Sequence, residues 1–259
     1  DTDGSGAPDI IYMQHDRVQV WLNQGGNSFI LGEPILLPEG VFFDRLCQVT
    51  AADVQGTGMA ELVLSVPYMT PGHWCYAFNS AKPYLLTSVN NNLGASHTLC
   101  YRSSAQSWLD EKQADPQAVP ALPFAMHLLV KTLTLDEITG NQLAQTCRYY
   151  QGVYDGRERE FRGFGYVETE DTNDDALPVG DDTPLAATLL TKSWYHCGRE
   201  ADETTLYGQP WQADGEAVTL NPTLFTTYED GQDKVLDTPD DTTRWWLYRA
   251  LKGATLRSE

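Results

Sequence analysis

Basic residues are scarce in this sequence. Its 259 residues include 17 Lys and Arg against 36 Asp and Glu, which gives a formal net charge of −19. Affinity for nucleic acids and for anionic membrane surfaces comes mainly from clustered Lys and Arg, so neither is expected as a partner. No run of about 18 apolar residues occurs either, which argues against a membrane-spanning helix and against direct membrane insertion.

Cysteines are few and widely spaced. There are five, at positions 47, 75, 100, 147 and 197. An odd number without short spacings indicates neither a disulfide framework nor a zinc site, so buried thiols are expected. Residues 1–6 have no start Met and no apolar signal core, and they look like the middle of a motif. We therefore expect the chain to be a piece of a longer protein.

Catalytic signatures are also missing. The histidines never occur in H-x-x-x-H spacing, and there is no G-x-S-x-G elbow, Walker loop or dinucleotide fingerprint. Glu158 and Glu160 would lie about 7 Å apart on one strand face, a separation that glycoside hydrolysis accepts. Their arginine neighbours would lower the carboxyl pKa values, however, whereas a general acid needs a raised pKa. Because Trp211, Trp245 and Trp246 are also expected in a core rather than stacked on sugars, we predict no enzyme and no catalytic residue.

Strand-like segments dominate what is present. Short runs rich in β-branched and aromatic residues, separated by Gly, Pro and Asn turns, indicate antiparallel β-structure. The expected strands cover 10–12, 18–22, 62–66, 73–78, 84–89, 97–101, 127–136 and 143–150. Helices are few: Ser103 can cap a helix over 104–112, and Asp241 or Thr242 can cap one over 242–252. The Pro-rich stretch 115–123 predicts a boundary, and the acidic stretch 168–182 predicts a solvated loop.

Two Asp-Gly loops repeat at a distance of 52 residues. The first covers residues 1–9 and the second residues 53–61, and each precedes an apolar strand. A repeat of this length matches one four-stranded propeller blade. Oxygen-bearing side chains at equivalent positions suit a hard cation such as Ca²⁺; they are Asp1, Asp3, Ser5 and Asp9 in the first loop and Asp53, Gln55 and Glu61 in the second. The alternative is that Asp and Gly only build an Asx turn between strands, with no cofactor required.

These loops resemble those of FG-GAP or integrin-type β-propellers. Three longer stretches carry a second resemblance: 82–104, which begins Lys82-Pro83-Tyr84, 154–168, and 248–259. Together they are similar to the middle region of the B component of bacterial insecticidal toxin complexes, the Tc toxins, which are related to SpvB and to RHS/YD-repeat proteins. The resemblance covers essentially the whole chain in order.

The resemblance implies an all-β fold with few short helices. Residues 1–80 would be the end of a β-propeller with FG-GAP-like blades, and residues 81–259 an antiparallel RHS-type β-shell. In this family the propeller docks on the A component, a translocation channel, and the shell built with the C component encloses a cytotoxic effector; the complex is secreted. The implied role is structural and non-enzymatic. The alternative is a cell-surface adhesin module with an FG-GAP propeller that recognises glycan or protein.

The block 157–165 is the longest unusual motif in the chain. Its aromatic residues and glycines alternate, as expected for a strand that curves and approaches its neighbour closely. Its arginines alternate with glutamates, which predicts cross-strand ion pairs, and Phe164→Ala is expected to cost about 3–5 kcal/mol as a core truncation. The predicted structural residues are Arg157, Glu158, Arg159, Glu160, Phe161, Arg162, Gly163, Phe164 and Gly165.

Overall fold

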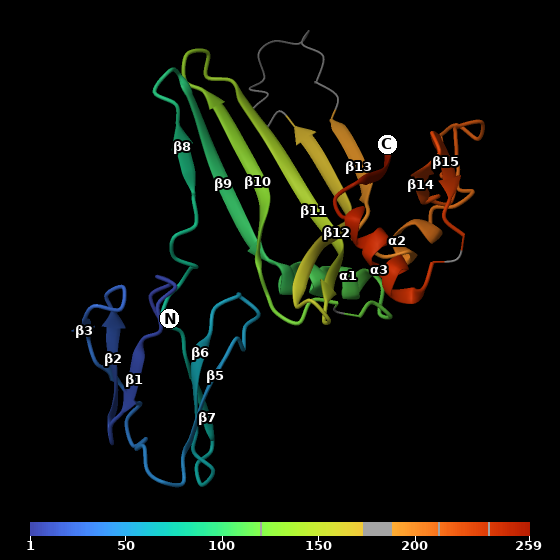
Figure 1. Cartoon of the computed structure of the whole chain (residues 1–259). Helices are drawn as coiled ribbons and strands as arrows, with labels where there is room; N and C mark the ends of the chain where they lie inside the picture. Colours follow the sequence, from blue (N-terminus) through green and yellow to red (C-terminus); the bar gives the residue numbers. More distant parts are fainter. Residues whose placement is uncertain (120, 173–187, 212, 238) are drawn as a thin grey trace. The chain divides into compact units, whose positions relative to one another are not determined.

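The computed structural model describes residues 1–119, 121–172, 188–211, 213–237 and 239–259. The chain forms two compact units, Asp1–Thr87 and Ser88–Glu259. Most of the regular structure in these ranges is antiparallel β-strand with a few short helices, which confirms the predicted fold class (Figure 1). None of the described helices is long and apolar enough to cross a membrane.

The first unit contains two small antiparallel sheets. In one, β2 pairs with β1, β3 and β4; the other has the order β5-β6-β7. The strands are β1 Ile10–Met13, β2 Arg17–Asn23, β3 Phe29–Leu31, β4 Ile35–Leu36, β5 Gln48–Ala52, β6 Glu61–Ser65 and β7 His73–Tyr76. The predicted strands at 10–12, 18–22, 62–66 and 73–78 thus correspond to β1, β2, β6 and β7.

Aliphatic side chains from both sheets form one core in this unit. Val18, Leu64 and Val66 have no exposed surface, and Val20 and Leu62 are almost as buried. Full burial of a Val or Leu side chain stabilises a fold by about 1.5–3 kcal/mol. This cluster is therefore the main apolar contribution to the stability of the first unit.

The second unit is built on a seven-stranded antiparallel sheet with the order β16-β13-β12-β11-β10-β9-β8, and a separate hairpin joins β14 to β15 (Figure 1). The strands are β8 Ser88–Asn90, β9 Ala95–Ser103, β10 His127–Asp136, β11 Gln142–Asp155, β12 Glu160–Thr172, β13 Leu189–Tyr195, β14 Thr226–Glu229, β15 Gln232–Val235 and β16 Thr255–Ser258. Consecutive strands from β8 to β13 lie side by side, so most pairings in the sheet are local in sequence.

Three helices accompany this sheet: α1 Ser104–Ala114, α2 Ala201–Thr204 and α3 Asp241–Ala250. Ser103 caps α1 as predicted, because its side chain accepts the backbone N–H of Ala105. The cap of α3 is Asp240, one residue before the predicted position, and it accepts the N–H groups of Thr242 and Thr243. Either aspartate of the pair at 240–241 has the right chemistry, and the extended backbone of Asp240 decides between them.

Other predictions need correction. Residues 84–87 are not a strand, because Tyr84 adopts a positive φ of 60° and β8 begins only at Ser88. The Pro-rich stretch 115–123 lies within the second unit rather than at its boundary; hydrogen bonds between Ser104 and Met126 hold its flanks together. Residues 168–172 belong to β12 instead of a loop, and residues 173–182 lie outside the described residues.

Candidate functional site

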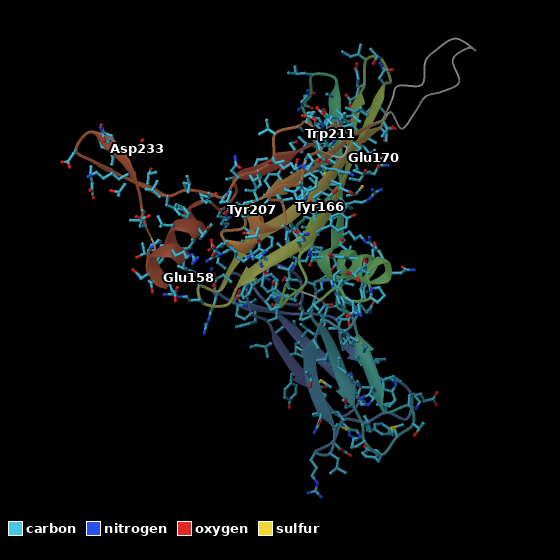
Figure 2. The ribbon with its side chains drawn as sticks, turned by 90° about the vertical axis from the view of Figure 1, so that its right-hand side faces the viewer. Glu158, Tyr166, Glu170, Tyr207, Trp211 and Asp233 are labelled. Atoms are coloured by element: carbon cyan, nitrogen blue, oxygen red, sulfur yellow. The ribbon has the colours of Figure 1, made fainter. Side chains whose placement is uncertain are left out.

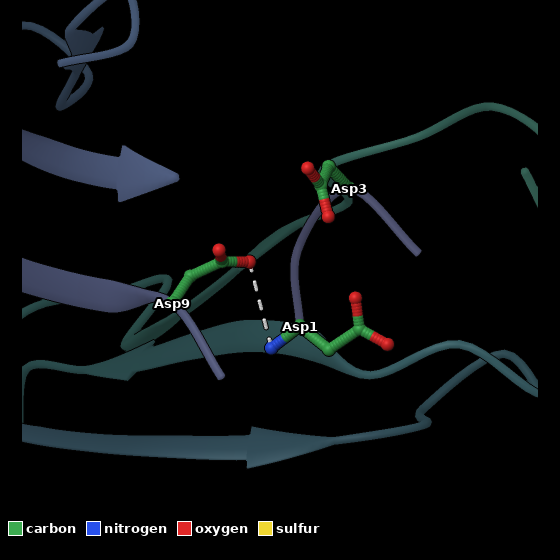
Figure 3. A group of neighbouring side chains, drawn as sticks. All are labelled: Asp1, Asp3 and Asp9. Atoms are coloured by element: carbon green, nitrogen blue, oxygen red, sulfur yellow. Dashed lines mark ion pairs between the residues drawn. The ribbon is translucent and has the colours of Figure 1, made fainter. Parts of the chain in front are cut away.

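The first Asp-Gly loop brings three carboxylates together ahead of β1 (Figure 3). Ligand oxygens of Asp1, Asp3 and Asp9 lie within 4.8 Å of one another, and this is the one such acidic group among the described residues. The carboxylate of Asp9 accepts hydrogen bonds from Thr2 and, at 2.8 Å, from the N–H of Asn23. Burial alone would raise the pKa of Asp9, but these hydrogen bonds lower it overall.

The Asx turn that was the alternative to a metal site is also present in this loop. Asp3 accepts the N–H of Ser5 at 3.0 Å, and Ser5 in turn accepts the N–H of Ala7 at 3.4 Å. The loop is thus closed by its own hydrogen bonds, and calcium would have to compete with them for oxygens of Asp3, Ser5 and Asp9.

The second loop, between β5 and β6, uses its oxygens differently. Both carboxylate oxygens of Asp53 accept loop N–H groups, from Thr57 at 2.8 Å and Gly58 at 2.7 Å. Gln55 is exposed, whereas Glu61 is 3% exposed and accepts the thiol of Cys75 at 3.0 Å. The three predicted ligand residues therefore face different surroundings, and this loop suits a turn better than a cation.

The central block forms a turn and the start of β12 instead of one continuous strand. Residues 156–159 make the turn between β11 and β12, where Figure 2 labels Glu158. Glu158 and Glu160 therefore do not share a strand face, and residues 157–159 have no strand register partners. The Asp155-Gly156 dipeptide is the sequence signal for this hairpin turn. Among the described residues the predicted cross-strand ion pairs are therefore missing for Arg157 and Arg159, whereas Arg162 on β12 does pair across strands, with Asp155 on β11.

A β-bulge places Arg162 in the interior. Tyr154 pairs with Phe161 and Val153 pairs with Gly163, so Arg162 is the extra residue on β12. Gly163 accommodates the bulge with a φ of 110°, a backbone conformation that favours glycine. Bulges turn side chains to new directions, and here the guanidinium becomes 99% buried.

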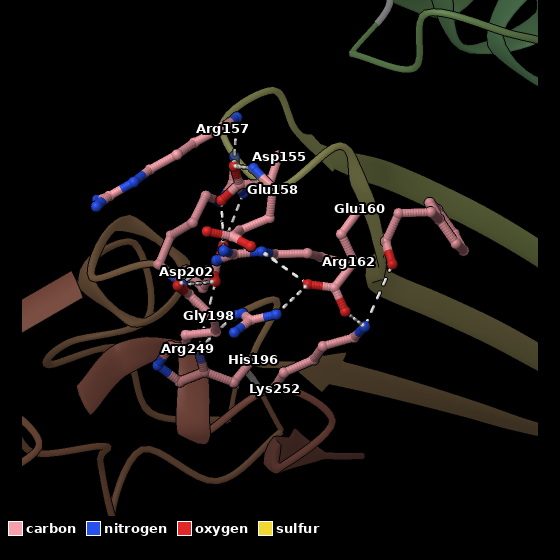
Figure 4. Close-up of polar contacts among 12 residues, drawn as sticks. Asp155, Arg157, Glu158, Glu160, Arg162, His196, Gly198, Asp202, Arg249 and Lys252 are labelled. Atoms are coloured by element: carbon pink, nitrogen blue, oxygen red, sulfur yellow. Dashed lines mark hydrogen bonds and ion pairs between the residues drawn. The ribbon is translucent and has the colours of Figure 1, made fainter. Parts of the chain in front are cut away.

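The buried guanidinium is surrounded by acidic and carbonyl groups (Figure 4). Arg162 forms an ion pair with Asp155, donates to the carbonyl of Gly198 at 3.0 Å and has its Nε 3.8 Å from Glu160. Nε and Nη2 make no hydrogen bond of good geometry, so their stabilisation comes from the two carboxylates. Burial alone would raise the pKa of Asp155, but the N–H groups of Glu158 and Arg157, with the Arg162 charge, lower it overall.

Helix α3 and the residues after it supply basic partners for Glu160 that the sequence analysis did not predict. Glu160 forms ion pairs with Arg249 at 3.3 Å and Lys252 at 2.7 Å. The hydrogen bond from Lys252 is the main cause that lowers the pKa of Glu160; partial burial opposes it and the bond from Arg249 adds to it. A lowered pKa is the opposite of what a general acid needs, which weakens the glycosidase reading further.

Trp245 on α3 lies among three guanidinium groups. Its ring centroid is 4.5 Å from the guanidinium carbon of Arg157, 5.0 Å from that of Arg162 and 5.6 Å from that of Arg249. Arg249 also lies over Trp246 at 5.1 Å. The two tryptophans therefore connect the turn, the bulge and α3 through cation–π contacts.

A second buried network adjoins this cluster. Glu203 on α2 has no exposed surface and accepts hydroxyl groups from Tyr207 and Thr223, both at 2.5 Å, and from Tyr248 at 3.4 Å. His196 has its Nε2 4.0 Å from Glu203, and its Nδ1 accepts the N–H of Gly198 at 3.0 Å. Burial first, and then the bond to Glu203, raises the pKa of Tyr207. The network ties loops and helices to one edge of the sheet.

A row of stacked aromatic rings crosses the sheet from β11 toward its β16 edge. Register places Tyr150, Tyr166, Trp194 and Arg257 side by side on β11, β12, β13 and β16; Tyr166 is labelled in Figure 2. The ring centroids of Tyr150 and Tyr166 are 5.3 Å apart, and those of Tyr166 and Trp194 are 4.9 Å apart. The guanidinium of Arg257 lies 5.3 Å from the Trp194 centroid.

The predicted aromatic packing of the central block is present in a weaker form. Phe164 contacts Phe161 and Tyr149, with centroid distances of 5.4 and 5.2 Å, but it is only half-buried. Its truncation is therefore expected to cost less than a fully buried site would. The contacts described for this region are ring packing, charge pairs and hydrogen bonds within the chain.

A family model for the middle/N-terminal region of the insecticide toxin TcdB matches residues 26–198 of the chain. The chain belongs to this family. Solved structures agree with this assignment. In a crystal structure of TcdB2-TccC3 without its hypervariable C-terminal region, one chain is 46% identical, with a TM-score of 0.87. The match covers 100% of this chain and 12% of that one.

Two further solved structures are similar to this chain to the same degree. One is described as TcdB2-TccC3-Cdc42, with 46% identity, and the other as the Photorhabdus luminescens Tc holotoxin pore, with 47% identity. Both have a TM-score of 0.87, and each match covers the whole of this chain and 12% of the other. Among proteins with curated descriptions, none matches the chain.

Proposed function

We propose that this chain is a non-enzymatic structural segment of a toxin-complex B component that is secreted with its complex. Residues 81–259 would form part of the hollow β-shell that encapsulates the effector of a C component. Residues 1–80 would belong to the propeller that docks on the A-component channel. The observation that carries the proposal is the match over the whole chain, at 46% identity, to TcdB2 in a complex with TccC3.

Each unit offers physical support. The second unit presents a broad antiparallel sheet whose long strands, such as β11 and β12, suit a wall. The first unit has two small sheets, each preceded or interrupted by an Asp-Gly loop at a spacing of 52 residues, as successive blades would. Arg162 and Glu203 are held by ion pairs and hydrogen bonds within the chain, which favours a scaffold over a catalytic centre.

A chimera tests the proposal directly. The matching segment of TcdB2 is replaced by these 259 residues, and the chimera is co-expressed with TccC3. We expect it to co-purify with TccC3 and to protect the enclosed part of TccC3 from added protease. A second chimera carries Arg162→Met, which we expect to destabilise the segment, and serves as the control in which the segment folds poorly.

A chimera that is folded by circular dichroism but leaves TccC3 unbound or open to protease would contradict the shell assignment. The adhesin alternative predicts a different result. In that case the 259-residue chain alone would bind specific members of a glycan array, whereas a wall segment should bind none.

A further inference from the structure

The turn between β11 and β12 carries two exposed arginines, Arg157 and Arg159. In the parts of the chain that the structure describes, neither Arg157 nor Arg159 lies within 4.0 Å of a carboxylate oxygen, and both are exposed. The neighbouring cations Arg162, Arg249 and Lys252 all have ion pairs. Arg157 and Arg159 thus lie on one turn, separated only by Glu158, in a chain with 36 acidic residues and 17 basic ones.

The turn fixes the backbone of both arginines, and a ring contact fixes the side chain of Arg157. The carboxylate of Asp155 accepts the N–H of Arg157 at 2.8 Å and that of Glu158 at 3.1 Å, and Arg159 adopts a φ of 54°. The guanidinium carbon of Arg157 lies 4.5 Å from the ring centroid of Trp245. In Figure 4 this side chain extends away from the ion pairs of Arg162 and Glu160. A guanidinium fixed in this way loses little side-chain entropy when it binds a ligand.

Aromatic surface continues from this turn along α3. Trp246 is 47% exposed and its ring contacts Arg249, which also contacts Trp245. Partly exposed tryptophan beside arginine is the composition that protein interfaces favour at their centres. We call residues 157–159 with Trp245 and Trp246 the Arg–Trp surface.

We propose that the Arg–Trp surface docks an acidic stretch of a partner polypeptide. The planar guanidinium groups of Arg157 and Arg159 match carboxylates, which they bind through paired hydrogen bonds. A nucleic acid is a less suitable occupant, because two arginines can neutralise only a few of its closely spaced phosphates, whereas a short acidic stretch carries few charges. This inference does not depend on the proposed shell function, since it rests on the turn and α3 alone.

Fluorescence anisotropy of the 259-residue chain with labelled peptides tests it. The probe is a ten-residue peptide of alternating Glu and Gly, and the reference peptide carries Gln in place of Glu. We expect the Glu peptide to bind more tightly and to weaken as salt is raised from about 20 to about 150 mM. The double variant Arg157→Gln/Arg159→Gln should lose about tenfold in affinity. Its melting temperature should fall by no more than about 3 °C, because both residues are exposed and only the cation–π contact of Arg157 with Trp245 is lost.

The matched control removes the same charge elsewhere. Arg45 and Lys112 are exposed and also lack an ion pair among the described residues, so Arg45→Gln/Lys112→Gln should keep affinity within about twofold. Equal losses in the two double variants, or equal binding of the Glu and Gln peptides, would overturn the proposal. So would tighter binding of a single-stranded oligonucleotide at the same arginines. Sedimentation that shows a dimer abolished by Arg157→Gln/Arg159→Gln would instead identify a second copy as the occupant.

Discussion

The two units of this chain stabilise their strands by different means. Asp1–Thr87 buries seven hydrophobic residues in one aliphatic cluster. Ser88–Glu259 has twice the length but buries only six hydrophobic residues in the part that the structure describes, and they are dispersed. It also buries Arg162, His196 and Glu203, each at most 2% exposed, within networks of specific partners.

This difference separates two ways of specifying a β-structure. A cluster of aliphatic side chains stabilises strongly but tolerates substitutions of similar volume. Buried charges stabilise little compared with apolar residues, but each requires its own partner in a fixed position. We therefore expect the stability of the first unit to depend on the volume of its buried side chains. The stability of the second unit should depend on the charge pairs around Arg162 and Glu203.

The largest effect is expected for Leu64→Ala in the first unit. Leu64 has no exposed surface, so the truncation should reduce the free energy of unfolding by about 4 kcal/mol. Native-state hydrogen exchange would report the loss in peptides from residues 1–87 and little change in residues 88–259. Leu36→Ala, at a site 65% exposed, is the matched control and should cost under about 0.5 kcal/mol. If protection from exchange were lost equally in both units, the Leu64 cluster would not be specific to the stability of the first unit.

The second effect in size is expected for Arg162→Met. Methionine has a similar volume but leaves the carboxylates of Asp155 and Glu160 without their buried partner, which should cost about 3 kcal/mol in urea unfolding. Arg102→Met breaks the exposed pair with Asp110 and should cost under about 1 kcal/mol. If the two variants unfold at the same urea concentration, charge pairing does not specify this unit.

Calcium should produce a smaller effect, confined to the first unit. If Asp1, Asp3, Ser5 and Asp9 bind the ion with a dissociation constant of about 1 mM, then 10 mM calcium stabilises the unit by about 1.4 kcal/mol. Calorimetry and melting curves should show this gain in the parent chain and in Asp53→Asn, and lose it in Asp3→Asn. Absence of heat at millimolar calcium would leave the first loop as an Asx turn only.

The smallest effect is expected for the pH dependence contributed by Glu160. Its pKa in the folded chain lies below the ordinary glutamate value of 4.5, so the stability it contributes is present above about pH 4.5 and is lost as pH falls through the folded pKa. Glu160→Gln should flatten acid unfolding of the second unit in this range. Glu158→Gln, in the same turn but without an ion pair among the described residues, should leave the curve unchanged.

Local features of the fold were predictable from the sequence. The strand at 127–136 has the predicted bounds, and Ser103 caps α1 because capping depends on neighbouring residues only. The surroundings of Glu160 were not predictable, since its partners Arg249 and Lys252 lie 89 and 92 residues away in sequence. The bulge at Arg162 was not predictable either, because it depends on how β12 aligns with β11. Propeller and shell remain predictions that follow from family membership.

The row of rings formed by Tyr150, Tyr166 and Trp194 has a consequence for how β13 finds its place. A hairpin turn sets the alignment of β11 with β12, but residues 173–188 separate β12 from β13, a connection too long to impose one. A slip of one residue would turn Trp194 to the opposite face and leave Tyr166 without its neighbour. The stacked rings therefore favour one alignment of β13 with β12 and disfavour the alignments that are shifted by one residue.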